Sequence, residues 1–220
     1  MTTLPDGGSA EEPTLATDGR PLGERGARTR RRLLDATEGL LEQRGVRDLT
    51  VADIARAVDT SPATFYQYFR SVEDAVLALA VDVGEQLAPI GVFLEAPLSE
   101  PDGLERAHAA VEAFLEFWDD HRAVLRTRNL AAQEGDTRFR DVRNRSLEPV
   151  TRAVAAQVER SQAAGDVDAS VTPYAAAAAL VAMIERMAAF HRDLEPRGVS
   201  RDALITTTAR ILHRSVTKLG

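Results

Sequence analysis

Apolar residues recur at every third or fourth position between Ala27 and Arg44, which is the spacing of one face of an α-helix. The residues on this face are Leu33, Leu34, Thr37, Leu40 and Leu41. Gly45 follows directly, and glycine is a common residue just past the end of a helix. The pattern therefore predicts one amphipathic helix that ends at about Arg44.

Two shorter helical patterns follow, and each begins at a residue suited to cap a helix. Thr50 and Asp53 resemble a capping box, with Asp in place of the preferred Glu or Gln. Ser61 before Pro62 provides an N-cap followed by proline at the first helical position. Three helices within residues 27–69, the last two joined by a tight turn, have the layout of a helix-turn-helix unit. In such a unit the second helix of the pair enters the major groove of DNA.

Helical patterns continue to the end of the chain. Ser71 with Asp74 opens the next helix, and the segment 88–103, with its prolines and glycines, is predicted to be a connection. Pro149 is expected to kink or break the helix that contains it. The further helices are predicted near 104–119, 122–133, 138–164, 173–192 and 200–219. Because no strand pattern occurs, the predicted fold class is all-α, with the carboxy-terminal helices in a bundle.

These patterns divide the chain into three parts. Residues 1–24 are rich in Gly, Pro, Thr and Asp without an apolar period, which predicts a disordered tail. Residues 25–72 form the N-terminal three-helix helix-turn-helix domain. Residues 73–220 form a C-terminal helical domain.

The composition is ordinary for a soluble globular protein, with 44% hydrophobic and 28% charged residues. No cysteine is present, which excludes disulfides and thiolate chemistry. No apolar run approaches the roughly 18 residues that a bilayer-spanning helix needs. The amino terminus lacks the basic-then-apolar pattern of a signal peptide. We therefore expect a cytoplasmic protein without a membrane partner.

The net charge of −7 conceals an uneven distribution of charge along the chain. Residues 20–72 carry ten Arg against seven Asp and Glu, whereas the parts on either side are acidic. A basic segment beside acidic ones attracts a DNA duplex to one end of the molecule and repels it from the rest. Arg28, Arg30, Arg31 and Arg32 are the candidates for this attraction, and a solvated arginine cluster at a helix start is the alternative interpretation.

The string LTVADIARAVDTSPATFYQYFRSVEDAVLALA, residues 49–80, resembles the signature of TetR-type transcriptional repressors. The positions that match in register are Thr50, Ile54, Ala55, Ser61, Thr64, Tyr66, Tyr68, Phe69, Ser71 and Glu73. The resemblance implies a helix-turn-helix DNA-binding domain followed by a helical domain for ligand binding and dimerisation. Asp59 stands where the family has glycine, and Asp can take a left-handed conformation at modest cost. Val72 replaces a lysine that contacts phosphate in the family, which implies that this contact is absent here.

Phe65 and Phe69 lie four positions apart on one face of the predicted second helix, and we assign them to the core. The amide of Gln67, on the outer side, can bond adenine through two hydrogen bonds, and the resemblance implies phosphate or base-edge partners for the neighbouring tyrosines. For Ser61, plain N-capping is an equal alternative. The candidate DNA-binding residues are Arg28, Arg31, Thr50, Thr60, Ser61, Ala63, Thr64, Tyr66, Gln67 and Tyr68.

The segments DDHRAVLRT (residues 119–127) and LVAMIERMAAF (residues 180–190) look like the ligand domain of the mycobacterial repressor of ethionamide activation and its relatives. This resemblance implies an internal cavity for a small hydrophobic effector, although most large apolar residues must form plain core. Glu185 is either a polar group inside that cavity or an exposed charge. The candidate ligand-binding residues are Phe114, Phe117, Trp118, Leu125, Phe139, Met183, Ile184, Met187 and Phe190.

Catalytic and metal chemistry find little support in the sequence. Glu105, His108 and Glu112 share one helix face, but the outer two lie about 10 Å apart, so we interpret them as charge pairing rather than as metal ligands. No Ser/His/Asp order and no Gly-rich phosphate loop stands out. We expect no enzymatic activity, no catalytic residue, no metal and no cofactor.

Small residues in the alanine run 175–179 and an apolar stripe on the final helix would allow close helix packing. In the family this helix pair forms a four-helix bundle with its twin, which implies a homodimer; packing within one chain is the alternative. The prediction is a homodimeric repressor, released from a palindromic double-stranded DNA operator by a small hydrophobic ligand. The alternatives are a helical small-molecule or lipid-binding protein or enzyme that uses the same cavity, and a protein-binding adaptor with a non-functional helix-turn-helix.

Overall fold

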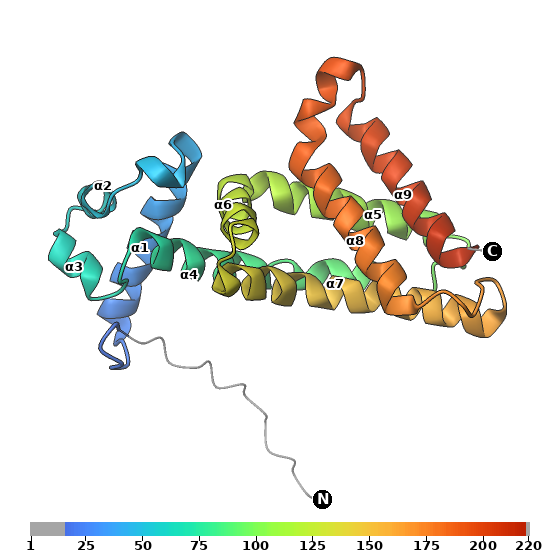
Figure 1. The fold of residues 1–220 in the computed structure, drawn as a ribbon, viewed down its shortest axis with the longest axis horizontal. Helices are drawn as coiled ribbons and strands as arrows, with labels where there is room; N and C mark the ends of the chain where they lie inside the picture. The colour runs from blue at the N-terminus through green and yellow to red at the C-terminus, as the bar shows by residue number, and fades with distance from the viewer. Residues whose placement is uncertain (1–15, 219–220) are drawn as a thin grey trace, which may run out of the picture. The chain divides into compact units, whose positions relative to one another are not determined.

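The computed structural model describes residues 16–218, which form α-helices, turns and short 3-10 segments without a β-strand (Figure 1). The all-α fold class is therefore confirmed for the described part of the chain. The chain divides into two compact units, Met1–Val76 and Leu77–Gly220. The division falls inside one helix, a few residues beyond the boundary expected at 72/73.

The first unit contains the three predicted helices and the beginning of the next. They are α1 (Glu24–Gln43), the 3-10 segment η1 (Val46–Asp48), α2 (Val51–Ala57), α3 (Pro62–Tyr66) and the first turn of α4 (Val72–Glu85). Helix α2 packs against both α1 and α3. The core between them contains Leu33, Leu34, Leu41, Ile54, Ala55, Phe65 and Phe69.

Short-range signals in the sequence set the helix starts of this unit. Thr50 and Asp53 form a complete capping box at the start of α2, and Ser61 caps α3 with Pro62 at its first position. The backbone N–H of Asp74 donates to Ser71 Oγ at 3.2 Å. All three predicted helix starts are thus confirmed.

Asp59, in the turn between α2 and α3, adopts a φ of 53°. This left-handed conformation is the one that the glycine of the related sequences would adopt freely, and Asp tolerates it better than most residues. The tight turn of the helix-turn-helix unit is therefore kept despite the substitution.

The expected disordered tail, residues 1–24, lies mostly outside the described residues. Residues 16–23 are described, and they differ from the expectation because they form a turn that packs against the end of α3. Their short polar and glycine-rich sequence offers no apolar period, so this long-range contact left no pattern to detect.

The second unit is a bundle of longer helices. It comprises the rest of α4, η2 (Ala88–Leu94), α5 (Gly103–Asp120), α6 (Arg122–Gln133), α7 (Thr137–Ala164), α8 (Pro173–Phe190), η3 (His191–Asp193), η4 (Glu195–Arg197) and α9 (Arg201–Thr217). Helix α7 packs along α6 and α8, and α5 packs along α9 (Figure 1). Helices α8 and α9 are joined by the turn that contains η3 and η4.

The structure refines two local expectations for this unit. Helix α7 runs without a break from Thr137 to Ala164 although Pro149 lies inside it. Pro149 is exposed, so water can reach the carbonyl group of Arg145 that proline cannot bond. The connection 88–103 contains a 3-10 segment and buries Leu94 and Leu98, because it packs on α5 and α7.

Gly103, at the start of α5, allows the backbone of this connection to lie directly against the helix. A Cβ atom at this position would lie 1.9 Å from the carbonyl oxygen of Leu98. Only glycine permits that approach.

Two segments, Val72–Leu94 and Pro173–Asp193, are long and apolar enough to cross a membrane by length and composition. The expectation that no stretch reaches this length is wrong on that criterion, because each segment combines a few isolated charges with many apolar residues. Core helices of folded domains pass the same test. Glu185, within the second segment, is buried between arginines of α6 and α7, which is the environment of a core helix.

Candidate functional site

Helix α3 separates its aromatic side chains into a buried and an exposed set. Phe65 is fully buried and Phe69 is 4% exposed, whereas Tyr66 is 52% exposed. Gln67 is exposed and Tyr68 is half-buried. The assignment of the two phenylalanines to the core is confirmed, and the side chains expected to read DNA lie on the accessible side.

The other predicted DNA contacts on α2 and α3 already have partners within the unit. Thr50 Oγ1 donates to Asp53 Oδ2 at 2.7 Å and accepts from the backbone N–H of Asp53 at 3.2 Å. Ser61 Oγ accepts from the backbone N–H of Thr64 at 3.2 Å and lies 3.1 Å from Thr64 Oγ1. Hydrogen bonding by Thr50, the leading cause, holds the pKa of Asp53 below its usual value. Capping is thus one role of Thr50 and Ser61, and their contact with DNA stays a prediction.

Thr60 and Thr64 are half-buried and Ala63 is exposed, so all three flank the accessible side of α3. Small residues at these positions leave the surface of the helix open to a groove or a phosphate. Their role in DNA binding also stays a prediction.

Two arginines of the cluster contact other parts of the first unit, and two exposed ones pair with acids on their own helix. The guanidinium group of Arg30 lies 5.4 Å from the centre of the Phe69 ring, and Arg32 donates to the backbone carbonyl of Val58 at 2.8 Å. Arg28 lies 3.6 Å from Glu24, and Arg31 lies 2.8 Å from Asp35. The side chains of Arg28 and Arg31 are more than half exposed, so both can exchange these acids for a phosphate at little cost.

Thr17 makes a contact with the end of α3 that no local pattern predicts. Its Oγ1 donates to the backbone carbonyls of Tyr66 and Gln67 at 3.0 and 3.1 Å, and its N–H donates to Gln67 O at 3.0 Å. These carbonyls stand at the end of α3 and have no partner further along the helix. Residues 16–23 and α3 together line a hollow of about 510 Å³, which Ala63, Tyr66, Gln67 and Tyr68 share.

In the second unit, Glu185 of α8 is buried and bonded to three side chains from α6 and α7. Its carboxylate accepts from Arg128 Nη2 at 3.2 Å and from Asn129 Nδ2 at 3.1 Å. Arg143 donates to both carboxylate oxygens, from Nε at 3.1 Å and from Nη2. The interpretation of Glu185 as an exposed charge is wrong, because the residue is 5% exposed, and its place inside an apolar ligand cavity stays a prediction.

Arg128 is the most deeply buried charged residue of this cluster, with 1% of its surface exposed. Burial lowers its pKa to about 10, with Glu185 acting to raise it and Arg143 acting to lower it. The group therefore stays charged at neutral pH. Among the described residues its Nη1 has no hydrogen-bond partner.

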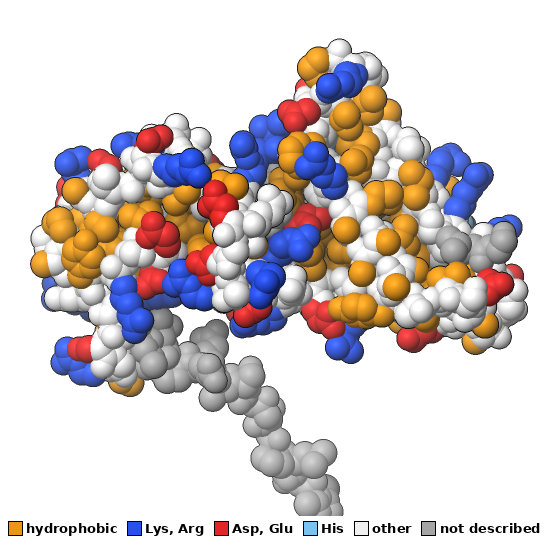
Figure 2. All heavy atoms as spheres, in the orientation of Figure 1, with side chains coloured by type: hydrophobic (Ala, Val, Ile, Leu, Met, Phe, Trp, Pro, Cys, Tyr) orange, Lys and Arg blue, Asp and Glu red, His pale blue; other side chains and the backbone are white. Residues whose placement is uncertain are grey.

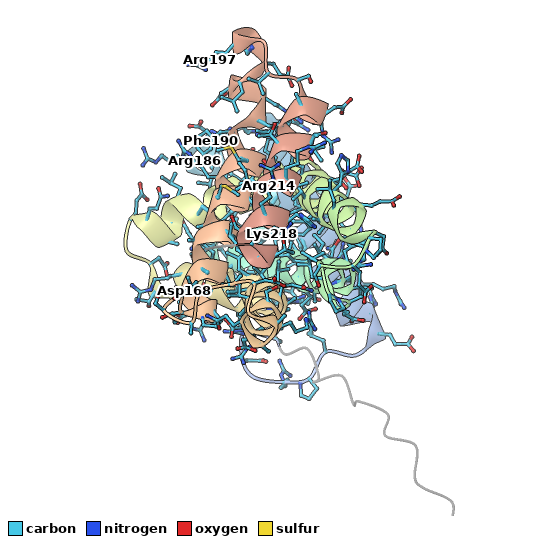
Figure 3. The ribbon with its side chains drawn as sticks, turned by 90° about the vertical axis from the view of Figure 1, so that its right-hand side faces the viewer. Asp168, Arg186, Phe190, Arg197, Arg214 and Lys218 are labelled. Carbon is cyan, nitrogen blue, oxygen red and sulfur yellow. The ribbon has the colours of Figure 1, made fainter. Side chains whose placement is uncertain are left out.

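Glu185 and Arg143 also line a hollow of about 370 Å³ between α6, α7 and α8, where Figure 2 shows acidic and basic side chains close together in a depression. Helix α6 contributes two amides and a small residue, α7 contributes two arginines, and α8 contributes the remainder. The lining residues are Asn129, Ala132, Gln133, Arg140, Arg143, Ala182, Glu185, Arg186, Ala189 and Phe190. On α8, Arg186 and Phe190 lie next to each other (Figure 3), with the guanidinium 3.5 Å from the ring centre.

Only Phe190 of the nine predicted ligand-binding residues lines this hollow. The side chains of Phe114, Trp118, Leu125, Phe139 and Ile184 are closed into the core, each at most 4% exposed. Phe117, Met183 and Met187 are half-buried, and Phe190 is 39% exposed. An apolar ligand among these residues stays a prediction. The bonds of Glu185 to Arg143 and Arg128 were missed because these partners lie 42 and 57 positions away in the sequence.

A second charged cluster forms around Asp119 at the end of α5. Its Oδ1 lies 2.7 Å from Arg122 Nη2, 2.9 Å from His191 Nε2 and 3.0 Å from Arg192 Nη2. Burial acts to raise the pKa of Asp119, but the hydrogen bonds from Arg122 and His191 together hold it below its usual value. The cluster ties the corner between α5 and α6 to the turn after α8.

Two of the three residues considered as metal ligands on α5, His108 and Glu112, lie next to each other. His108 Nδ1 lies 3.7 Å from Glu112 Oε2, and both side chains are exposed. Within residues 16–218 no group of three or more His, Cys, Asp and Glu side chains is placed to hold a metal ion.

Two family models match the chain and together account for most of both units. The model described as "Tetracyclin repressor-like, C-terminal domain" matches residues 98–219, which is more than half of the chain. The model described as "Bacterial regulatory proteins, tetR family" matches residues 33–79, from α1 into α4.

Curated relatives and solved structures agree with these models. HTH-type transcriptional regulator EthR of Mycobacterium tuberculosis is 32% identical over 94 residues, which is 43% of this chain and 44% of the relative. The uncharacterized regulator YdgC of Bacillus subtilis is 28% identical over 104 residues, 46% of this chain and 53% of the relative. The matched stretch thus spans about half the length of these curated relatives.

Among solved structures, Salmonella enterica GusR superposes with a TM-score of 0.63 at 21% identity, covering 87% of this chain and 96% of that chain. A Rhodococcus protein of unknown function gives 0.65 at 23% identity, covering 84% and 93%. At these identities the likeness establishes the fold alone.

Proposed function

Because the chain belongs to the TetR family of bacterial regulatory proteins, we propose that it is a cytoplasmic DNA-binding transcriptional regulator. It acts as a homodimeric repressor that a small molecule releases from a palindromic operator. The observation that carries the proposal is the segment of α3 and the turn after it, which buries Phe65 and Phe69 and presents Tyr66 and Gln67 outward in a complete helix-turn-helix unit. No enzymatic activity forms part of this proposal.

Within the operator, α3 lies in the major groove. Gln67 reads a base, because its amide can donate to adenine N7 and accept from adenine N6–H. Tyr66 and the hydroxyl groups at the start of the helix contact the phosphate backbone, which positions the helix without selecting a sequence. Arg28 and Arg31 add an attraction that salt screens.

The dimer forms through α8 and α9. Figure 2 shows hydrophobic side chains spread over the surface of α8, and several small or apolar residues there are exposed. The exposed residues of this kind are Tyr174, Ala175, Ala178, Ala179, Ala182, Phe190 and Ile211. Small residues let two helix pairs approach closely, and exposed apolar patches of this kind commonly mark protein interfaces.

A small molecule that binds the second unit favours a dimer arrangement whose two α3 helices no longer match successive major grooves. DNA and ligand then prefer different states of one equilibrium, so each weakens the binding of the other. Successive major grooves lie about 34–36 Å apart, which is the spacing that the DNA-bound state must provide.

The test is binding of the purified protein to the palindrome in its own promoter region and to a scrambled duplex. Gln67→Ala should reduce the discrimination between the two by about 1–3 kcal/mol, whereas Tyr66→Phe should weaken both alike. Gln43→Ala, the same change on an exposed residue of α1, serves as the control. If the unchanged protein retains no duplex at low salt, the proposal is wrong. If Gln67→Ala weakens both duplexes equally, Gln67 does not read the sequence.

A further inference from the structure

The hollow between α6, α7 and α8 holds more positive charge than its one carboxylate balances. Arg140, Arg143 and Arg186 line it together with Glu185, and Arg128 lies directly behind that carboxylate. Arg128 and Arg143 are both bonded to Glu185. The positive charge of these two arginines therefore exceeds the negative charge of Glu185, the only acid that lines the hollow.

Within residues 16–218, neither Arg140 nor Arg186 lies in an ion pair with an acid. Arg186 is held over the Phe190 ring, with its guanidinium 3.5 Å from the ring centre, which leaves the edge of the guanidinium available for hydrogen bonds. Arg140, across the hollow on α7, is exposed. Planar arginine groups bind carboxylates and phosphates through two parallel hydrogen bonds.

The rest of the lining is apolar or neutral. Ala132, Ala182, Ala189 and the Phe190 ring offer carbon surface, and Gln133 offers an amide. The volume of about 370 Å³ lies within the usual range of about 300–1,000 Å³ for small-molecule sites. The hollow thus combines an anion-binding edge with an apolar wall.

We propose that this hollow binds a small amphipathic anion, with its carboxylate or phosphate on Arg140 and Arg186 and its apolar part against the alanines and Phe190. As the site of the effector, this inference rests on the proposed function and specifies the chemical class of the ligand. As a binding site, it stands on the charges and the lining alone.

The first experiment measures binding of three probes with the same chain length, octanoate, octyl phosphate and 1-octanol, to the full chain by calorimetry without DNA. Octanoate or octyl phosphate should bind, more weakly as salt is raised, and 1-octanol should bind at least about tenfold more weakly. The stronger of the two anions identifies the head group. Equal binding of 1-octanol would overturn the proposal.

The second experiment locates the site with the variants Arg140→Gln and Arg186→Gln. Each substitution should lower the affinity for the preferred anion by about tenfold. Arg126→Gln, an exposed arginine of α6 outside the hollow, is the matched control and should leave the affinity unchanged. Unchanged affinity in both hollow variants would overturn the proposal. So would a loss of the dimer in sedimentation with anion binding intact, because the arginines would then serve a second copy of the chain.

A third measurement tests whether binding of the anion in the hollow also releases DNA. The preferred anion should release the operator from the unchanged protein and should do so at higher concentration in Arg186→Gln. If the anion binds the hollow without releasing DNA, its assignment as effector is wrong although the proposed repressor stands. If no duplex binds at all, the proposed function fails while the calorimetric result still decides the anion site.

Discussion

In the first unit the polar side chains around α2 and α3 bond to groups three positions away, Thr50 to Asp53 and Ser61 to Thr64. In the second unit Glu185 bonds to Arg128 57 positions away, and Gln157 bonds to Leu98 59 positions away. The polar contacts that start α2 and α3 thus lie within single helix turns, and the first unit adds longer ones from Thr17 to Gln67 and from Arg32 to Val58. The second unit is held by polar contacts between helices that are distant in sequence.

This difference determines what the removal of one side chain does. A lost cap frees one or two backbone groups at a helix end that water can reach, so the cost is small. A lost interhelical partner leaves a charge or several backbone groups without a partner inside the core. Four predictions test this comparison, from the largest expected effect to the smallest.

Glu185→Gln should cost about 3–5 kcal/mol of unfolding free energy, because Arg128 would stay buried without a counter-charge. Chemical unfolding monitored by circular dichroism measures this loss. Glu116→Gln, an exposed change on α5, is the control and should stay within about 0.5 kcal/mol of the unchanged protein. The double variant Arg128→Met with Glu185→Leu should recover much of the loss, since no buried charge remains. Equal midpoints for Glu185→Gln and Glu116→Gln would show that the buried cluster does not stabilise the bundle.

The same contrast explains how much could be predicted from the sequence. The capping pairs and the Phe65–Phe69 face have both partners within one helix turn, so their spacing alone predicted the unit around α3. The fold class followed as well, since helical periodicity is a local property.

Contacts between distant positions could not be predicted in this way. Nothing near Glu185 indicates whether it is buried, because its partners lie on two other helices. The contact of Thr17 with the end of α3 spans 50 positions and was missed for the same reason. Pro149 was expected to kink or break α7, and the helix continues through this exposed proline without a break while it packs on α6 and α8.

Gln157→Leu should lower the free energy of unfolding by about 2–4 kcal/mol, which is the second largest of the four effects. The side-chain amide donates to the carbonyls of Leu94 and Ala96 at 2.6 and 2.8 Å, and its oxygen accepts from the N–H of Leu98 at 2.8 Å. Leucine would leave the carbonyl of Ala96 and the N–H of Leu98 without these partners. The carbonyl of Leu94 would keep only the bond from Arg160 Nη2 at 3.3 Å. The comparison variant is Gln162→Leu on the same helix, at a residue that is only half-buried. This change should lower the free energy of unfolding by about 1 kcal/mol. Similar losses for the two glutamines would remove the distinction between interior and surface contacts.

Thr50→Ala should cost about 1 kcal/mol through loss of the capping box of α2. The effect should be confined to the first unit, so hydrogen exchange of the α2 amides should accelerate while that of α7 stays the same. Thr29→Ala serves as the control, because that hydroxyl bonds only to the carbonyl of Arg25 within α1. Faster exchange throughout α7 would indicate that the two units are coupled rather than held separately.

The smallest effect should be the pH dependence that Asp119 adds to stability. Its carboxylate faces Arg122 of α6, His191 and Arg192 of η3, and Arg201 of α9 at 3.9 Å, and it is one-fifth exposed, so solvent screens part of the interaction. The folded-state pKa of Asp119 lies below its ordinary value, so the carboxylate stabilises the fold above that ordinary value.

This stabilisation should be lost as the pH falls through the folded-state pKa. Urea unfolding of Asp119→Asn and of the unchanged protein should therefore differ most at pH 6–7. The difference should shrink as the pH falls below the ordinary Asp value of about 4, and it should vanish only below the lower folded-state pKa. Asp120→Asn, at the exposed neighbouring position, should follow the unchanged protein at every pH. A constant difference between Asp119→Asn and the unchanged protein from pH 7 to pH 3 would mean that Asp119 stabilises the corner through its shape rather than its charge. The long-range ionic contacts of the second unit would then be confined to the Glu185 cluster.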